Sequence, residues 1–197
     1  MAEQQVPHEH RAPKRQTRMP TGVPNLDLVL DGGLSPGELM FILGAPGSGK
    51  TTLASQIAFT AARSGTAVPL LTVWSEPTSK LLDHLAGFDF YDHDLIGGPI
   101  QVLSLQQEML KGLSVIGETV RTMVRQYKAG LVLLDGFRGI SHIEQDPQGA
   151  REFLYTLGRR WKRVGRPCSS PVKRIPVILP SFPRRRPLMW SWGYITA

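Results

Sequence analysis

The sequence predicts an α/β fold, with a mostly parallel β-sheet flanked by helices on both faces. Short apolar segments of strand length alternate with longer amphipathic segments between residues 21 and 166. A glycine-rich loop separates the first apolar segment from the first long helical segment, and a later apolar segment ends in an aspartate. Strands that alternate with helices form parallel sheets, because a helical crossover returns the chain to the same end of the sheet.

Each element is predicted from its own pattern. Four apolar runs predict strands: 38–43, 67–73, 100–103 and 131–134. Apolar residues at helical spacing predict a short turn at 26–30 and helices at 51–63, 78–85, 113–127 and 148–164. Pro69 is an irregularity in the second strand, because proline lacks the N–H that a central strand needs.

The composition indicates one domain with terminal extensions. The chain has 197 residues and a net charge of +7, yet residues 21–166 hold 14 basic and 14 acidic side chains. We therefore divide it into a disordered polar leader at 1–20, a folded core at 21–166 and a Pro/Arg-rich tail at 167–197. The leader has no apolar signal core, and no apolar run approaches the roughly 18 residues of a membrane span, which predicts a cytoplasmic protein with no membrane partner.

The tail differs from the core in composition. It contains six prolines, the run Arg184-Arg185-Arg186 and no acidic residue. The apolar triplet Val177-Ile178-Leu179 is short and lies between Pro176 and Pro180, so we do not expect it to form a central strand. The predicted sheet is therefore incomplete at its C-terminal end.

Residues 44–51 match the phosphate-loop pattern G-x-x-x-x-G-K-[ST], with a predicted strand before them and a predicted helix after them. The glycines let successive backbone N–H groups turn towards phosphate oxygens, and the helix N-terminus adds a positive dipole. Lys50 is expected to reach the β and γ phosphates of ATP, and Thr51 to offer its hydroxyl to Mg²⁺. The candidate ATP-binding residues are Gly44, Ala45, Pro46, Gly47, Ser48, Gly49, Lys50, Thr51 and Thr52.

Two carboxylates are candidates to complete this site. Asp135 ends the apolar strand 131–134, a position from which a side chain can reach Mg²⁺ directly or through water. Glu76 follows the strand 67–73 and should lie at the same edge of the sheet, where it could orient or deprotonate water. Lys50 and Glu76 are therefore the candidate catalytic residues. The structural alternative is that Glu76 lies at a helix N-terminus, where the helix dipole favours a glutamate, with Pro77 in the first turn.

The residues ahead of the loop carry a more specific pattern. Thr21-Gly22-Val23-Pro24-Asn25-Leu26-Asp27, then Gly32-Gly33-Leu34, Gly37, the phosphate loop and Gln56 follow one another in order. This series resembles the opening of the KaiC-like branch of the RecA-type P-loop ATPases. The resemblance extends from about residue 21 to residue 165, and the chain departs from the family pattern after that point.

The resemblance implies a RecA-like fold, ATP with Mg²⁺, and assembly into homo-oligomeric rings or filaments. It assigns phosphate and metal binding to Lys50 and Thr51, and the metal-associated aspartate to Asp135. Glu76 matches one member of the family's acidic pair, whereas the other position is Ser75. Family members continue with further strands, so the change of composition after residue 165 predicts an ending that is truncated or out of frame.

Three functional interpretations remain open at this stage. The first is a Mg-dependent ATPase that acts as a regulator or signalling protein, with autokinase activity allowed by the family but supported by no particular residue. The second is a module that binds nucleotide with little turnover, which Ser75 and the altered ending favour. The third is a recombinase-like protein that associates with DNA, for which the basic ends are the support.

Overall fold

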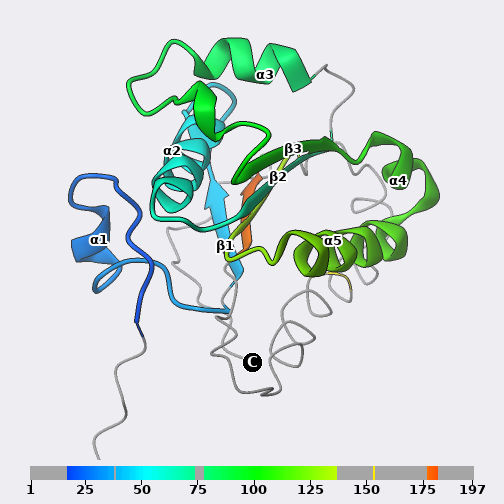
Figure 1. Cartoon of the computed structure of the whole chain (residues 1–197), viewed down its shortest axis with the longest axis horizontal. Coiled ribbons are helices and arrows are strands. Elements are labelled where there is room, and N and C mark those ends of the chain that lie inside the picture. Colours follow the sequence, from blue (N-terminus) through cyan, green and yellow to red (C-terminus); the bar gives the residue numbers. More distant parts are fainter. Residues whose placement is uncertain (1–16, 38, 74–77, 137–152, 154–176, 182–197) are drawn as a thin grey trace, which may run out of the picture.

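The computed structural model describes residues 17–37, 39–73, 78–136, 153 and 177–181, and Figure 1 shows their arrangement. The helices are α1 (Leu26–Val29), α2 (Lys50–Arg63), α3 (Thr78–Leu85), η1 (His93–Leu95, a 3₁₀ turn), α4 (Gln106–Lys111) and α5 (Leu113–Tyr127). The strands are β1 (Leu39–Leu43), β2 (Val68–Thr72), β3 (Ile100–Ser104), β4 (Val132–Asp135) and β5 (Val177–Ser181).

The five strands form one sheet in the order β1-β5-β4-β2-β3, and all paired strands are parallel. The predicted α/β class with a mostly parallel sheet is therefore confirmed. The described residues supply these five strands, which make a partial sheet of the predicted kind. Because all strands run the same way, the C-terminal ends of β1, β2 and β4 lie at one edge, and the phosphate loop begins there.

The two faces of the sheet carry separate core layers, with α2 on one side and α5 on the other (Figure 1). Leu70 and Leu133 pack in the layer that contains α2, whereas Leu71 and Leu134 pack in the layer that contains α5. Successive residues of a strand point to opposite faces, so both sides of β2 and β4 are apolar. This double burial explains the continuous apolar runs in the sequence.

Strand β5 corrects the prediction for the tail. Val177–Ser181 lies between β1 and β4, so the expectation that proline-bracketed residues could not form a central strand was wrong. The ladder with β4 pairs Val177 and Ile178 alone, while the ladder with β1 runs to Ser181. Pro180 therefore lies beyond the doubly paired part of β5, where a missing N–H is less costly.

Pro69 is tolerated in β2 for the same reason. It pairs with Gln101 of β3, but the ladder between β2 and β4 begins one residue later, at Leu70. Both prolines thus occupy positions where their strand has a neighbour on one side.

Polar contacts hold the segment before β1 together and join it to α2. The backbone N–H and the hydroxyl of Thr21, a fully buried residue, both donate to Asp27 Oδ1, at 2.8 and 2.7 Å. Gln56 of α2 donates to the carbonyl of Gly22 at 3.2 Å. Gly22 has a φ of +68°, and a Cβ there would come within 2.3 Å of the Thr60 hydroxyl. The close approach of this segment to α2 therefore requires glycine.

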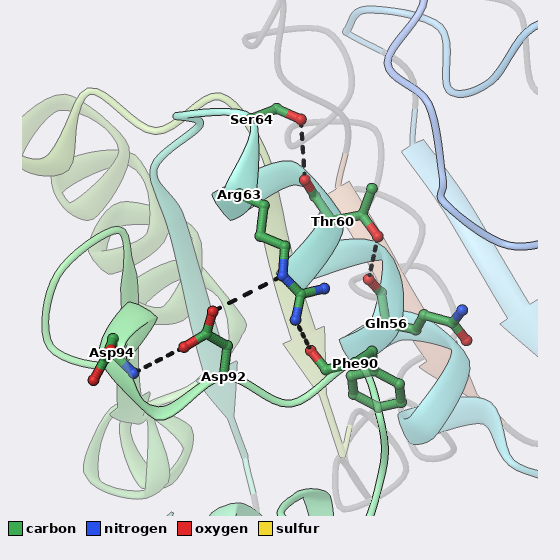
Figure 2. Close-up of polar contacts among 7 residues, drawn as sticks. All are labelled: Gln56, Thr60, Arg63, Ser64, Phe90, Asp92 and Asp94. Atoms are coloured by element: carbon green, nitrogen blue, oxygen red, sulfur yellow. Dashed lines mark hydrogen bonds and ion pairs between the residues drawn. The ribbon is translucent and has the colours of Figure 1, made fainter.

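The C-terminal end of α2 is tied to the connector between α3 and β3 (Figure 2). Arg63 donates to the carbonyl of Phe90 at 2.8 Å, and its Nε lies 3.9 Å from Asp92 Oδ2. Phe59 contacts Phe90 and Tyr91 with ring centroids 5.8 and 5.4 Å apart. Together with the Gly22 contact, these interactions hold α2 along its length.

Several predicted elements agree closely with the structure, and others differ. The helices predicted at 78–85 and 113–127 are α3 and α5, whereas α4 and η1 were not predicted because both are short. Of the helix predicted at 148–164, the structure describes Phe153, which is helical and buried against Gly117 of α5. The rest of that helix and the leader at 1–16 lie outside the described residues. No helix in the described part is long and apolar enough to cross a membrane.

Replacing Asp27 by alanine should lower the free energy of unfolding by about 2–3 kcal/mol, because two donors of Thr21 would lose their shared acceptor in a buried place. Asp27→Asn retains an oxygen and should cost about 1 kcal/mol or less. Urea unfolding measures both values, and equal losses in the two variants would contradict this role for the Asp27 oxygen.

Ile178→Pro should destabilise the protein by about 1–3 kcal/mol or more, because residue 178 is paired to strands on both sides and would lose a ladder donor. Ser181→Pro is the matched control, since Ser181 pairs with β1 alone. Thermal unfolding compares the two variants. A Ser181→Pro variant that loses as much stability as Ile178→Pro would argue against a central β5.

Candidate nucleotide and magnesium site

The phosphate loop joins the end of β1 to the start of α2 and has the backbone that its glycines were predicted to allow. Gly47 and Gly49 have φ values of +74° and +78°, in the left-handed region that L side chains rarely adopt. A Cβ on Gly44 would lie 2.4 Å from the hydroxyl oxygen of Ser48. Residues 45–49 are exposed. The loop is therefore an accessible turn that needs glycine at 47 and 49 for its backbone angles and at 44 for space.

The N-terminus of α2 follows directly after this loop. The helix has 14 residues, begins at Lys50, and has no side-chain hydrogen bond capping its first turn. The backbone N–H groups at such an end carry a partial positive charge and favour an anion. This part of the structure thus has the geometry of a phosphate-binding helix end.

Lys50 is buried, with 8% of its surface exposed, although it borders an exposed loop. Its Nζ donates to the carbonyl of Ala45 at 2.7 Å and lies 3.5 Å from the Ser48 hydroxyl. The ammonium group is therefore folded over the loop and held by loop oxygens, at the place where phosphate oxygens would be its partners.

Asp135 lies at the end of β4 and is brought to the same place by the sheet. The hydroxyl of Thr51 donates to its carboxylate, and the N–H of Gly136 donates to Oδ1 at 2.8 Å. Thr51 and Asp135 were both predicted as magnesium ligands, and the structure places them in contact. Lys50 is close enough for its charge to act on Asp135.

Burial raises the pKa of Asp135 above its ordinary value, because a carboxylate loses hydration when it leaves water. The Thr51 hydroxyl, the Gly136 N–H and the positive charge of Lys50 act in the opposite direction and lower this pKa. Burial is the larger effect. Burial therefore disfavours the ionised form of Asp135, and a bound cation would favour that form again.

Two further residues, Glu76 and Thr52, were predicted to belong to the site. Glu76 lies outside the described residues, so its role stays a prediction; the described part of β2 ends four residues before it in the sequence. Thr52 lies in the first turn of α2 beside Thr51. Among the described residues, no group of three or more His, Cys, Asp or Glu side chains could hold a metal. Thr51 and Asp135 are the described residues whose oxygens could hold a magnesium ion here.

Thr72 was not predicted as part of the site. It is the last residue of β2, is 7% exposed, and is the register partner of Asp135. Its hydroxyl has no hydrogen-bond partner in the described structure. The signal in the sequence is weak, since a threonine at the end of an apolar strand is common; the pairing of β2 with β4 is what places it at the site.

The comparisons with known proteins agree with this geometry. The family model described as "ATPase: KaiC" matches residues 19–166. The circadian clock protein KaiC3 of Synechocystis is 28% identical over 162 residues, covering 75% of this chain and 31% of that protein. The circadian clock oscillator protein KaiC of Prochlorococcus marinus is 29% identical over 130 residues, covering 63% of this chain and 26% of that protein.

A shorter stretch of the chain is similar to a DNA repair protein. The DNA repair protein RadA of Mycobacterium tuberculosis is 48% identical over 46 residues, which is 23% of this chain and 10% of that protein. The chain thus spans less than a third of the length of each of these relatives. The family model covers most of the chain, and the parallel sheet, the phosphate loop and the Thr51–Asp135 contact are consistent with it; this chain belongs to the KaiC family of ATPases.

Proposed function

We propose that this chain binds ATP in the cradle of residues 44–52 and hydrolyses it with Mg²⁺, as an ATP-driven regulator. The observation that carries the proposal is the contact between Thr51 and Asp135, with Lys50 beside them. A phosphate loop alone provides an anion site. Its combination with a partly buried carboxylate at the end of β4 provides, in one place, groups for both the phosphates and a divalent cation.

The phosphate chain is assigned to the loop N–H groups, the N-terminus of α2 and Lys50. The Lys50 ammonium donates to the Ala45 carbonyl, and it would exchange this neutral acceptor for charged phosphate oxygens. Hydrogen bonds to charged groups are roughly twice as strong as those between neutral groups, so the exchange favours the nucleotide-bound form.

The magnesium site is assigned to the oxygens of Thr51 and Asp135. Mg²⁺ prefers oxygen ligands and usually retains several waters, with one or two carboxylates and substrate phosphates completing its shell. That preference fits a site where a hydroxyl and a single carboxylate meet. When bound, the ion would supply charge neutralisation for the phosphates.

Turnover requires a residue that orients or deprotonates water, and we assign that role to Glu76. This assignment rests on its place in the sequence after β2, whose C-terminal end lies beside that of β4. The regulatory role and assembly into a homo-oligomer rest on the names and family of the relatives. Magnesium-dependent nucleotide binding without phosphate release would instead support a module with little turnover.

A DNA-associated function is the second candidate. The similarity of 46 residues to a DNA repair protein and the basic residues at both ends of the chain favour it. Phosphate contacts weaken as salt rises, so this function requires salt-dependent binding of single-stranded DNA by the full chain. Absence of binding at low salt would exclude it.

Lys50→Ala should weaken the binding of a fluorescent ATP analogue by about 10- to 100-fold, because the loop would lose its charged donor to the phosphates. Phosphate release should fall to the background level. Lys111→Ala is the control, since Lys111 is an exposed lysine at the end of α4. Unchanged nucleotide affinity in a folded Lys50→Ala variant would refute the assigned binding site.

Asp135→Asn should raise the free energy of unfolding at neutral pH when nucleotide and magnesium are absent. The pKa of Asp135 is raised in the folded state, so its ionised form destabilises the fold at pH values above that pKa. As the pH falls through the folded pKa towards the unfolded value of about 4, the wild-type protein binds a proton and regains this stability. The difference between the two proteins should therefore shrink towards low pH.

Chemical denaturation of both proteins across that pH range measures the difference. In the same assay, Mg²⁺ with ATP should stabilise the wild-type protein more than Asp135→Asn, because ligand binding adds to folding stability. A difference that grows as the pH falls would contradict the raised pKa, and equal stabilisation by Mg²⁺ and ATP would contradict the metal assignment.

A further inference from the structure

The hydroxyl of Thr72 is an unexplained polar group in the core. Thr72 is 7% exposed, and its Oγ1 has no hydrogen-bond partner in the part of the chain that the structure describes. An unsatisfied buried hydroxyl destabilises a fold, and valine would have nearly the same shape without that penalty. The contacts of the described residues therefore give no stability reason for threonine at this position.

The register of the sheet places this hydroxyl beside Asp135. Thr72 and Asp135 are Cα partners on β2 and β4, and neighbouring strands lie about 5 Å apart. Their sequence neighbours Leu71, Val73 and Leu134 belong to the core layer of α5. Because side chains alternate along a strand, Thr72 and Asp135 both lie on the α2 face, where Asp135 meets Thr51.

Hydrogen bonds hold the backbone around Thr72 in place. Its carbonyl accepts from the N–H of Leu105 at 2.7 Å, and the next residue, Val73, donates to the Asp135 carbonyl at 3.0 Å. The side chain can still turn, since rotation about χ1 moves the hydroxyl among three staggered positions. The backbone of Thr72 is therefore held by hydrogen bonds, while its hydroxyl can still rotate towards a new acceptor.

Asp135 retains capacity for another donor. Its carboxylate accepts from the Thr51 hydroxyl and the Gly136 N–H, whereas an ionised carboxylate offers about four acceptor positions. Carboxylates that bind metals are commonly held by further hydrogen bonds from neighbouring groups, which set their orientation. Thr72 is the buried donor without a partner that the register places next to it.

Ser55 is a second buried hydroxyl without a hydrogen-bond partner. It lies within α2, where a serine can turn its hydroxyl back to a helix carbonyl one turn earlier. Thr72 lies on a strand whose nearby carbonyls are used by the ladder, so it has no such local alternative. The two cases differ, and Thr72 alone is paired in register with a site residue.

We propose that Thr72 is a positioning residue for Asp135, whose hydroxyl donates to the carboxylate when Mg²⁺ and ATP are bound and keeps it turned towards the ion. This inference rests on the proposed function, because it assigns Asp135 to magnesium. Thr72 acts through Asp135 and touches neither the nucleotide nor the ion.

The test compares Thr72→Val, which removes the hydroxyl at nearly constant shape, with Thr72→Ser, which retains it. Equilibrium binding of a fluorescent ATP analogue is measured during Mg²⁺ titration and in EDTA. Thr72→Val should melt at the same temperature as the wild type or higher, and should bind the analogue in EDTA within about twofold of the wild type. Its half-saturating Mg²⁺ concentration should rise by about 10-fold.

Thr72→Ser should return the half-saturating Mg²⁺ concentration to within about twofold of the wild-type value, because its hydroxyl can make the same bond. An unchanged Mg²⁺ dependence in Thr72→Val would overturn the positioning role while leaving the proposed function intact. A Thr72→Ser variant as impaired as Thr72→Val would also overturn it, since packing would then be the cause. Absence of Mg²⁺-dependent binding in the wild type would overturn both proposals.

Discussion

The hydrogen bond from Thr51 to Asp135 is the contact on which the site depends. It joins the first turn of α2 to the end of β4, two elements far apart in the sequence. The contact forms because parallel strands bring β1, which leads into the phosphate loop, and β4, which ends in Asp135, to the same edge of one sheet. The Gln56–Gly22 hydrogen bond and the Arg63 contacts hold the helix that carries Thr51.

The same edge of the sheet carries groups that do not favour folding. These groups are the partly buried carboxylate of Asp135, the buried ammonium of Lys50 and the hydroxyl of Thr72, which has no hydrogen-bond partner among the described residues. Elsewhere, β2 and β4 are apolar on both faces. Proteins place such unfavourable groups where binding or catalysis requires them, and the remaining core compensates for their cost. These three groups therefore lie at the same edge of the sheet as the phosphate loop.

Strand β5 affects the site indirectly. It lies between β1 and β4, so the distance between the strand that leads into the phosphate loop and the strand that carries Asp135 depends on it. Residues 177–181 follow the region matched by the family model, which ends at residue 166. The geometry of the site thus depends on a short segment that composition alone assigned to a tail.

The sequence by itself determined the parallel α/β class, the phosphate loop and Asp135, because each is a local pattern of glycine, apolar and charged residues. Glu76 stays a prediction. The tertiary structure decided that Val177–Ser181 is a central strand and that Thr72 lies beside Asp135. Both depend on strand pairing between distant segments, and one residue's shift in register would turn Thr72 to the other face. Local patterns carry no information about such pairing.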